Sequence, residues 1–324
     1  MPVTRSAGTR CGVSTLVHTA TRCRALAAAS LAVAAAGCEL REITIADADD
    51  VVVAEFVLIA GAPRQSGMLH RTLGSDSSRV PATGASVRIV AADGGELELS
   101  AAPPDFCFID GSDDDGAPAC YASTRTVLPG SFVVPGETYT LRIRLADGRE
   151  LTGTTTVPAP FQLRRPAASA CALPPGQPLD IVWTMSPTAW LYAAETELNG
   201  LRAALAARGI DVEREPLRLF GLALSNTDTT IAFPAEFGVF DRFDPDLTET
   251  LAAIQTGLPP GIDADVVIAA ADRNYVNWER GGNFNPSGFV RVPSVFGDGT
   301  GVFGAVLPRT FQLTTHPNPA LPAC

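Results

Sequence analysis

Short runs of alternating apolar and polar residues, separated by turn dipeptides, constrain this chain more than any other feature. Residues 85–100 alternate on both sides of Asp93-Gly94-Gly95, and residues 139–157 alternate around Asp147-Gly148. Asp-Gly and Gly-Gly favour two-residue hairpin turns, and alternation with period two gives a strand one buried face. The sequence therefore predicts antiparallel hairpins that pack into a β-sandwich of the immunoglobulin-like type.

The rest of the chain is interpreted in the same way as mostly β. Further strands are expected at 51–59, 132–134, 179–184, 265–271 and 302–313, while residues 61–84 are expected to form a loop. Short helices are expected at 198–208 and at 247–256, the second because Asp244 precedes Pro245 as an N-cap and Gly257 follows. Residues 190–195 fit either a strand or a helix start. The expected fold class is an immunoglobulin-like β-sandwich followed by a second mainly-β domain, fibronectin- or immunoglobulin-like, with one or two short helices.

The first 37 residues have the layout of a secretory signal. They contain no Asp or Glu, and Arg22 and Arg24 precede the apolar run of residues 25–36. That run is too short to cross a bilayer. It ends in Ala35-Ala36-Gly37-Cys38, which resembles the bacterial lipobox although Ala35 stands where Leu is usual. We expect Cys38 to be acylated; the alternative is a soluble secreted protein cut near Ala36.

These features divide the chain into five parts. They are a lipoprotein signal peptide (1–37), an acidic tether (38–50), a β-sandwich domain (51–160), a linker rich in Pro and Ala (161–178) and a second mainly-β domain (179–324). After the signal peptide we expect no transmembrane helix.

The charge of the chain limits its partners. The formal net charge is −11, and it becomes more negative when the four arginines of residues 1–37 are removed. Phosphate backbones and anionic lipid headgroups repel such a chain, which argues against nucleic acid and against polybasic membrane docking.

Four cysteines follow Cys38, and an exported chain would oxidise them. Sequence allows three pairings of Cys107, Cys120, Cys171 and Cys324. We expect Cys107–Cys120, which brackets one polar loop, and Cys171–Cys324, which brackets the second half of the chain. A metal site is less favoured because the chain has no CxxC and only two histidines, His70 and His316, after the signal peptide.

Two clusters are candidates for ligand binding. Aromatic and polar residues that suit sugar or peptide contacts lie together at Asp272, Arg273, Asn274, Tyr275 and Trp278, although aromatics near closing strands are often part of a core. Carboxylates that suit calcium lie together at Asp110, Asp113, Asp114 and Asp115, but their spacing lacks the terminal Glu of an EF-hand, and a solvated acidic loop is the alternative.

Catalysis and cofactors find little support. Gly299, Gly301 and Gly304 match GxGxxG, but no acid follows them, so we expect them to serve close backbone packing. The chain has no HExxH or GxSxG, and a hydrolase would depend on His70 or His316. We therefore expect no enzyme and no cofactor.

Four stretches after the lipobox Cys38 resemble one family. They are residues 135–143, 148–158, 271–278 and 295–305. Together they are similar to the domain of unknown function family 4249, over most of the chain except residues 194–262. The resemblance implies an outer-membrane lipoprotein of the bacterial cell envelope, facing the periplasm or the surface, beside a TonB-dependent receptor, and implies no catalytic residues. The expected function is an accessory or ligand-binding protein of a transport system; a surface adhesin or carbohydrate-binding module is the alternative, and a hydrolase the third.

Overall fold

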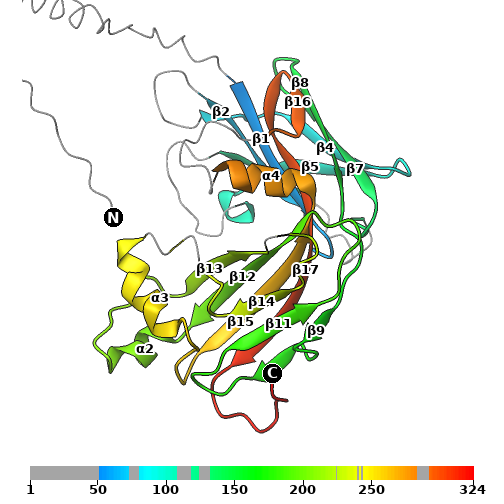
Figure 1. The fold of residues 1–324 in the computed structure, drawn as a ribbon. Helices are drawn as coiled ribbons and strands as arrows, with labels where there is room; N and C mark the ends of the chain where they lie inside the picture. Colours follow the sequence, from blue (N-terminus) through cyan, green and yellow to red (C-terminus); the bar gives the residue numbers. More distant parts are fainter. Residues whose placement is uncertain are drawn as a thin grey trace, which may run out of the picture. The chain divides into compact units, whose positions relative to one another are not determined.

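Strands are the main secondary structure of the computed structural model (Figure 1), which describes residues 51–72, 80–107, 118–123, 132–223, 225–238, 241, 244–282 and 292–324. All of them belong to one unit, residues 48–324. The strands are β1 (Val51–Ile59), β2 (Ser66–Thr72), β3 (Val80–Pro81), β4 (Ser86–Ala91), β5 (Glu96–Ala102), β6 (Ala119–Ser123), β7 (Thr138–Arg144), β8 (Glu150–Thr156), β9 (Leu163–Arg165), β10 (Ala170–Ala172), β11 (Leu179–Trp183), β12 (Leu191–Asn199), β13 (Leu217–Leu222), β14 (Thr230–Phe233), β15 (Asp263–Ala271), β16 (Val295–Gly297) and β17 (Gly299–Thr314). The helices are η1 (Pro104–Phe106), α2 (Leu201–Ala206), η3 (Pro245–Leu247), α3 (Thr248–Ile254) and α4 (Arg273–Gly282).

The expected mostly β fold is confirmed. One sheet has the strand order β13-β12-β15-β17-β1-β2-β6-β5-β4-β7-β8-β16, with β10 paired to β17 and β3 paired to β2. A second sheet has the order β14-β11-β9. The hairpins β4–β5 and β7–β8 lie where the turn dipeptides predicted them, and their buried and exposed residues alternate.

The core formed by the strands of residues 51–160 lies between the inward faces of these hairpins and β1. Val87 and Ile89 of β4 and Leu141 and Ile143 of β7 are buried. Phe56 of β1 and Tyr121 of β6 are buried in the same core cluster. Period-two alternation thus decides which residues of each strand face the core and which face solvent.

The second sheet covers the face of β12 that carries Tyr192. The ring centroids of Trp183 and Tyr192 lie 5.1 Å apart, and those of Phe161 and Tyr192 lie 5.6 Å apart. Trp183 is buried, as expected for a core tryptophan. Of residues 190–195, which fit either a strand or a helix, residues 191–195 belong to the strand β12.

The long strand β17 takes part in both halves of the main sheet. Residues 299–306 pair with β1 in parallel, and residues 306–314 pair with β15 in antiparallel. The neighbouring β16 pairs with β8. The C-terminal strands therefore hydrogen-bond to strands of residues 51–160, and the division of the chain into two domains stays a prediction.

The glycines of the GxGxxG match serve this close packing. Gly301 has a φ of +138° and lies opposite Ala54, and a Cβ there would overlap the Ala54 carbonyl oxygen and lie 2.7 Å from its nitrogen. Only glycine adopts this conformation at such close range without strain.

Some local expectations were wrong. Residues 61–84 were expected to form a loop, but β2 and β3 lie there, and His70 is a buried strand residue rather than a loop residue. The strand β2 (SGMLHRT) has few β-branched residues, so its strand conformation depends on its pairing with β1 and β6. Residues 132–134 form no strand, and the segment 161–178 carries β9 and β10.

Among the described residues, two of the three α-helices were expected from sequence. The Asp244 side chain accepts a hydrogen bond from the Asp246 backbone nitrogen at 3.1 Å, so the expected N-cap starts the turn that leads into α3. The helix α2 is shorter than expected because β12 continues to Asn199. The helix α4 was not expected.

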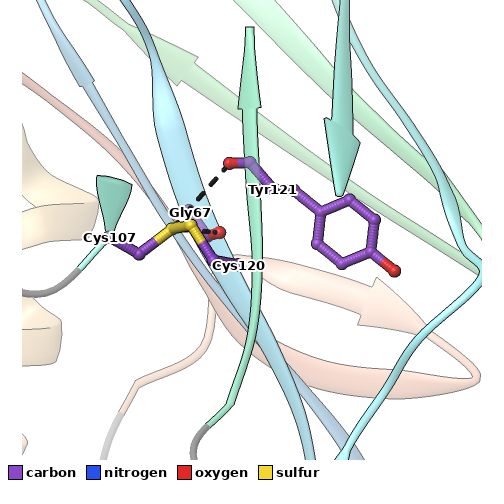
Figure 2. Close-up of a disulfide and its surroundings, with 4 residues drawn as sticks. All are labelled: Gly67, Cys107, Cys120 and Tyr121. Carbon is purple, nitrogen blue, oxygen red and sulfur yellow. Dashed lines mark hydrogen bonds between the residues drawn. A yellow bond between two sulfur atoms is a disulfide. The ribbon is translucent and has the colours of Figure 1, made fainter. Parts of the chain in front are cut away.

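Both expected disulfides are confirmed. Cys107 pairs with Cys120 and Cys171 pairs with Cys324. In the chain-entropy description, closing these loops stabilises the fold by roughly 3 and roughly 5 kcal/mol as upper values. The Cys107 sulfur of the first bridge (Figure 2) lies 3.2 Å from the Gly67 carbonyl oxygen and 4.0 Å from the Tyr121 carbonyl oxygen. A disulfide sulfur has no hydrogen to donate, so these are packing contacts that hold η1 against β2 and β6.

Among the described residues, no helix has the length and apolar character that crossing a bilayer requires.

Candidate functional site

The ligand surface expected from sequence lies at the start of α4, beside the middle of β17 (Figure 1). Its first residue, Asp272, points inward. The Asp272 carboxylate accepts hydrogen bonds from the backbone nitrogens of Tyr275 at 2.9 Å and Ala305 at 3.1 Å. It also accepts one from the buried hydroxyl of Thr155 at 2.6 Å. Asp272 therefore joins α4 to β17 and β8.

Burial raises the pKa of Asp272, and its hydrogen bonds oppose that rise in part. The bonds favour the charged carboxylate, whereas removal from water disfavours it. This combination is typical of a structural helix cap as well as of a functional acid, and the three internal donors favour the structural role.

Asn274 also points inward. Its side-chain nitrogen donates to the carbonyl oxygens of Thr154 at 2.8 Å and Phe303 at 2.9 Å. Gly304 permits this approach, since a Cβ there would lie 2.9 Å from the Tyr275 backbone nitrogen. Two of the five expected ligand residues, Asp272 and Asn274, thus use their side chains to hold α4 on the sheet.

The remaining three lie further out. Arg273 is exposed, and its guanidinium carbon lies 5.2 Å from the ring centroid of Trp190, a side chain that is 46% exposed. Tyr275 is half-buried against Leu191 and Val276. Burial raises the pKa of Tyr275, and the negative charges of Glu279 and Glu195 raise it further. Trp278 is half-buried. The exposed part of the expected surface is therefore the Arg273–Trp190 pair, and ligand binding there stays a prediction.

A pocket of about 370 Å³ lies on the face of the sheet that carries Leu191 of β12. It is lined by Glu195, Phe220, Asp241 and Val267, among others, and by the ion pair of Arg218 with Glu197 at 3.0 Å. The Glu195 side chain has an exposed surface, yet the pocket walls desolvate its carboxyl group and raise its pKa. The sequence does not reveal this pocket, because its residues come from three strands and from Asp241. The available signal was a glutamate directly after the apolar run 191–194.

The calcium hypothesis is not tested. Asp110, Asp113, Asp114 and Asp115 lie outside the described residues. Within the described part of the chain, no group of three His, Cys, Asp or Glu side chains has an arrangement that would hold a metal ion. The predicted lipidation site Cys38 also lies outside the described residues.

Comparison with known proteins adds no family. No family model matches the chain, and no curated protein matches it. Among solved structures, the fibronectin(III)-like modules of CbhA from Clostridium thermocellum match at 10% identity, with a TM-score of 0.19, over 82% of this chain and 91% of that chain. A likeness this weak carries no argument about function. The resemblance to the domain of unknown function family 4249 therefore stays a hypothesis.

Proposed function

We propose that this chain is an exported, lipid-anchored binding protein of the bacterial cell envelope. The observation that carries the proposal is the state of its cysteines. All four that follow Cys38 are joined in two disulfides, which persist in oxidising compartments and are rare in the bacterial cytosol. This pairing supports an exported protein and complements the secretory pattern of residues 1–37.

The proposed anchor is an acylated Cys38 followed by the acidic tether of residues 38–50. Acyl chains contribute about 0.8 kcal/mol per buried methylene, so two or more chains on one cysteine would hold a protein of this size at a membrane. The strand Val51–Ile59 begins directly after the tether. The proposed tether thus lies between the proposed lipid and the strand β1.

The proposed activity is binding rather than a reaction. The resemblance to family 4249 suggests an accessory role beside a TonB-dependent receptor in the outer membrane. The pocket beside Glu195 and the exposed Arg273–Trp190 pair are two surfaces of the kind that such a role requires. An adhesin or carbohydrate-binding module is the second candidate, and an exposed polar sheet face, described below, favours it.

The first experiment tests the anchor. The Cys38→Ser variant should move from the membrane fraction to the soluble fraction and lose labelling by radioactive palmitate. Cys23→Ser is the matched control, because Cys23 lies within the proposed signal peptide and should have no effect. Cys38→Ser protein that stays in the membrane fraction with its label would overturn the proposed anchor.

The second experiment separates the two candidate functions. The lipidated protein is purified by affinity from gently solubilised native membranes, and Cys38→Ser is the control. Recovery of a TonB-dependent receptor with the native protein alone supports the accessory role. Recovery of no partner, with the protein accessible on intact cells, supports the adhesin.

A further inference from the structure

The outward face of β4, β7, β8 and β16 carries an unusual row of side chains. In register across the four strands lie Arg88, Arg142, Thr152 and Phe296, each directly opposite the next. Arg144 lies two residues from Arg142 on the same face. We refer to these five side chains as the arginine face. They are exposed, whereas the alternate residues of the same strands are buried in the core.

The charges of this face are poorly compensated. Arg88 and Arg142 are like charges at directly opposite positions, an arrangement that destabilises a sheet. The Arg142 side chain forms no ion pair and no hydrogen bond with any residue that the structure describes. The ion pairs Arg88–Glu96 and Arg144–Glu150 are both 3.7 Å long, and all four side chains are at least half exposed. Ion pairs of this kind are weak and easily replaced by a ligand.

An aromatic platform lies at one end of the row. Phe296 is 58% exposed, more than any other large apolar side chain that the structure describes as exposed. The arginine face lines a hollow of about 580 Å³ together with Ser86 and the edge glycine Gly297. Adjacent strands lie about 4.8 Å apart, so the Phe296 ring and the base of Arg142 are separated by about 10 Å, a span of about two sugar rings.

We propose that the arginine face binds a polysaccharide that carries carboxylate groups, such as a polyuronic acid. One sugar ring stacks its apolar face on Phe296, and the carboxylate of a neighbouring sugar accepts paired hydrogen bonds from the planar Arg142 guanidinium. Arg88 and Arg144 flank this position, and the extended strand face suits a linear chain.

The acidic residues around the face favour a ligand with a lower charge density than duplex nucleic acid. Glu96 and Glu150 are paired with Arg88 and Arg144, and Glu98 lies opposite Arg88 on β5. A nucleic acid, with its dense phosphates, would meet these carboxylates and the overall negative charge of the chain. A polymer with one carboxylate per sugar has a lower charge density than duplex DNA, so it meets less of this repulsion and still reaches the Arg142 guanidinium.

The inference deepens the proposed function and rests on it for the location of the face outside the cytosol. It does not depend on the anchor or on a receptor. Binding by the purified full-length protein tests the ligand class, whereas the fractionation experiment tests the anchor. A failure of the ligand proposal can therefore be distinguished from a failure of the proposed anchor.

The test is isothermal titration calorimetry of the full-length purified protein with oligogalacturonate, with its methyl ester as the neutral probe of the same shape. We expect binding of the acid form that weakens with salt, and at least about tenfold weaker binding of the ester, as expected for loss of a charge-assisted hydrogen bond. Equal affinity for the two probes, or no binding of either at millimolar concentration, would overturn the proposal.

Variants assign the binding to this face. Arg142→Gln and Phe296→Ala should each weaken binding about tenfold or more. Arg164→Gln is the matched control, because Arg164 is exposed on β9 of the second sheet and should change affinity less than about twofold. All three side chains are exposed, so none of the variants should lower the unfolding midpoint appreciably. Unchanged affinity in Arg142→Gln and Phe296→Ala, or equal losses in Arg164→Gln, would contradict the assignment.

Discussion

The surface at the start of α4 and the arginine face are both mixtures of polar and aromatic residues, but they use their polar groups in opposite ways. At α4, Asp272 and Asn274 point inward and satisfy backbone and hydroxyl groups of β8 and β17. On the arginine face, Arg142 points outward and lacks an ion pair among the described residues. Composition alone does not separate these two cases. The number of hydrogen bonds and ion pairs that each side chain makes within the protein separates them. A polar group with partners in the protein stabilises the fold, whereas a polar group without them is available to a ligand.

The comparison predicts that changes at the α4 junction lower stability, whereas changes on the arginine face lower binding without a comparable loss of stability. The strand β17 is the sharpest place to test the first half, because it pairs with β1 and supports α4.

The largest effect is expected for Gly301→Val. The added side chain would overlap the Ala54 carbonyl on β1, and the φ of +138° is unfavourable for valine. Strain and overpacking together should lower the free energy of unfolding by about 4 kcal/mol or prevent folding. Urea unfolding followed by tryptophan fluorescence measures it. Thr300→Val, which introduces the same residue at the preceding position with almost no change of volume, should change stability by less than about 0.5 kcal/mol. Equal behaviour of the two variants would contradict the close approach of β17 to β1.

A smaller loss is expected for Asp272→Ala. The variant leaves the backbone nitrogens of Tyr275 and Ala305 and the Thr155 hydroxyl without their acceptor. Loss of this cap should cost about 3 kcal/mol in the free energy of unfolding, and Asp272→Asn, which keeps an acceptor, should cost less. Arg273→Ala, next to it but exposed, is the control and should change stability little. An Asp272→Ala protein as stable as the native one would show that α4 does not depend on this carboxylate.

The ionisation of Asp272 should make the stability of the protein depend on pH. Burial raises its pKa above the ordinary value of 3.8. The folded state therefore binds a proton more tightly than the unfolded state, so the contribution of Asp272 to stability is present below pH 3.8 and declines as pH rises through the folded pKa. The difference in unfolding free energy between the native protein and Asp272→Asn should decrease with rising pH over this range. A difference that increases with pH would mean that the hydrogen bonds outweigh burial and lower the pKa.

Sequence patterns located the hairpins, the disulfides and the N-cap at Asp244 because each depends on residues close in the chain or on the small number of cysteines. They failed at β2, which pairs with distant strands, and at α4, which hydrogen bonds of Asp272 and Asn274 hold on β8 and β17. The residues Asp272 to Trp278 were selected as a ligand surface by composition, and sequence does not reveal that Thr155 and Ala305 would receive the Asp272 carboxylate. The arginine face was missed for the same reason, since Arg88, Arg142 and Phe296 become neighbours through strand register.

The smallest effect on stability, and the one with the most informative sign, is expected for Arg142→Thr. Removing one of two directly opposed arginines relieves repulsion with Arg88, and threonine favours a strand, so the free energy of unfolding should rise by about 0.5 kcal/mol at low salt and by less at high salt. Arg144→Thr is the control, because it removes an ion pair with Glu150 and should be neutral or slightly destabilising. Paired urea unfolding curves at two salt concentrations resolve the difference. An Arg142→Thr protein that is more stable but no longer binds oligogalacturonate would mean that Arg142 serves its ligand at a cost to the stability of the sheet. A less stable Arg142→Thr protein would mean that Arg142, like Asp272 and Asn274, stabilises the fold.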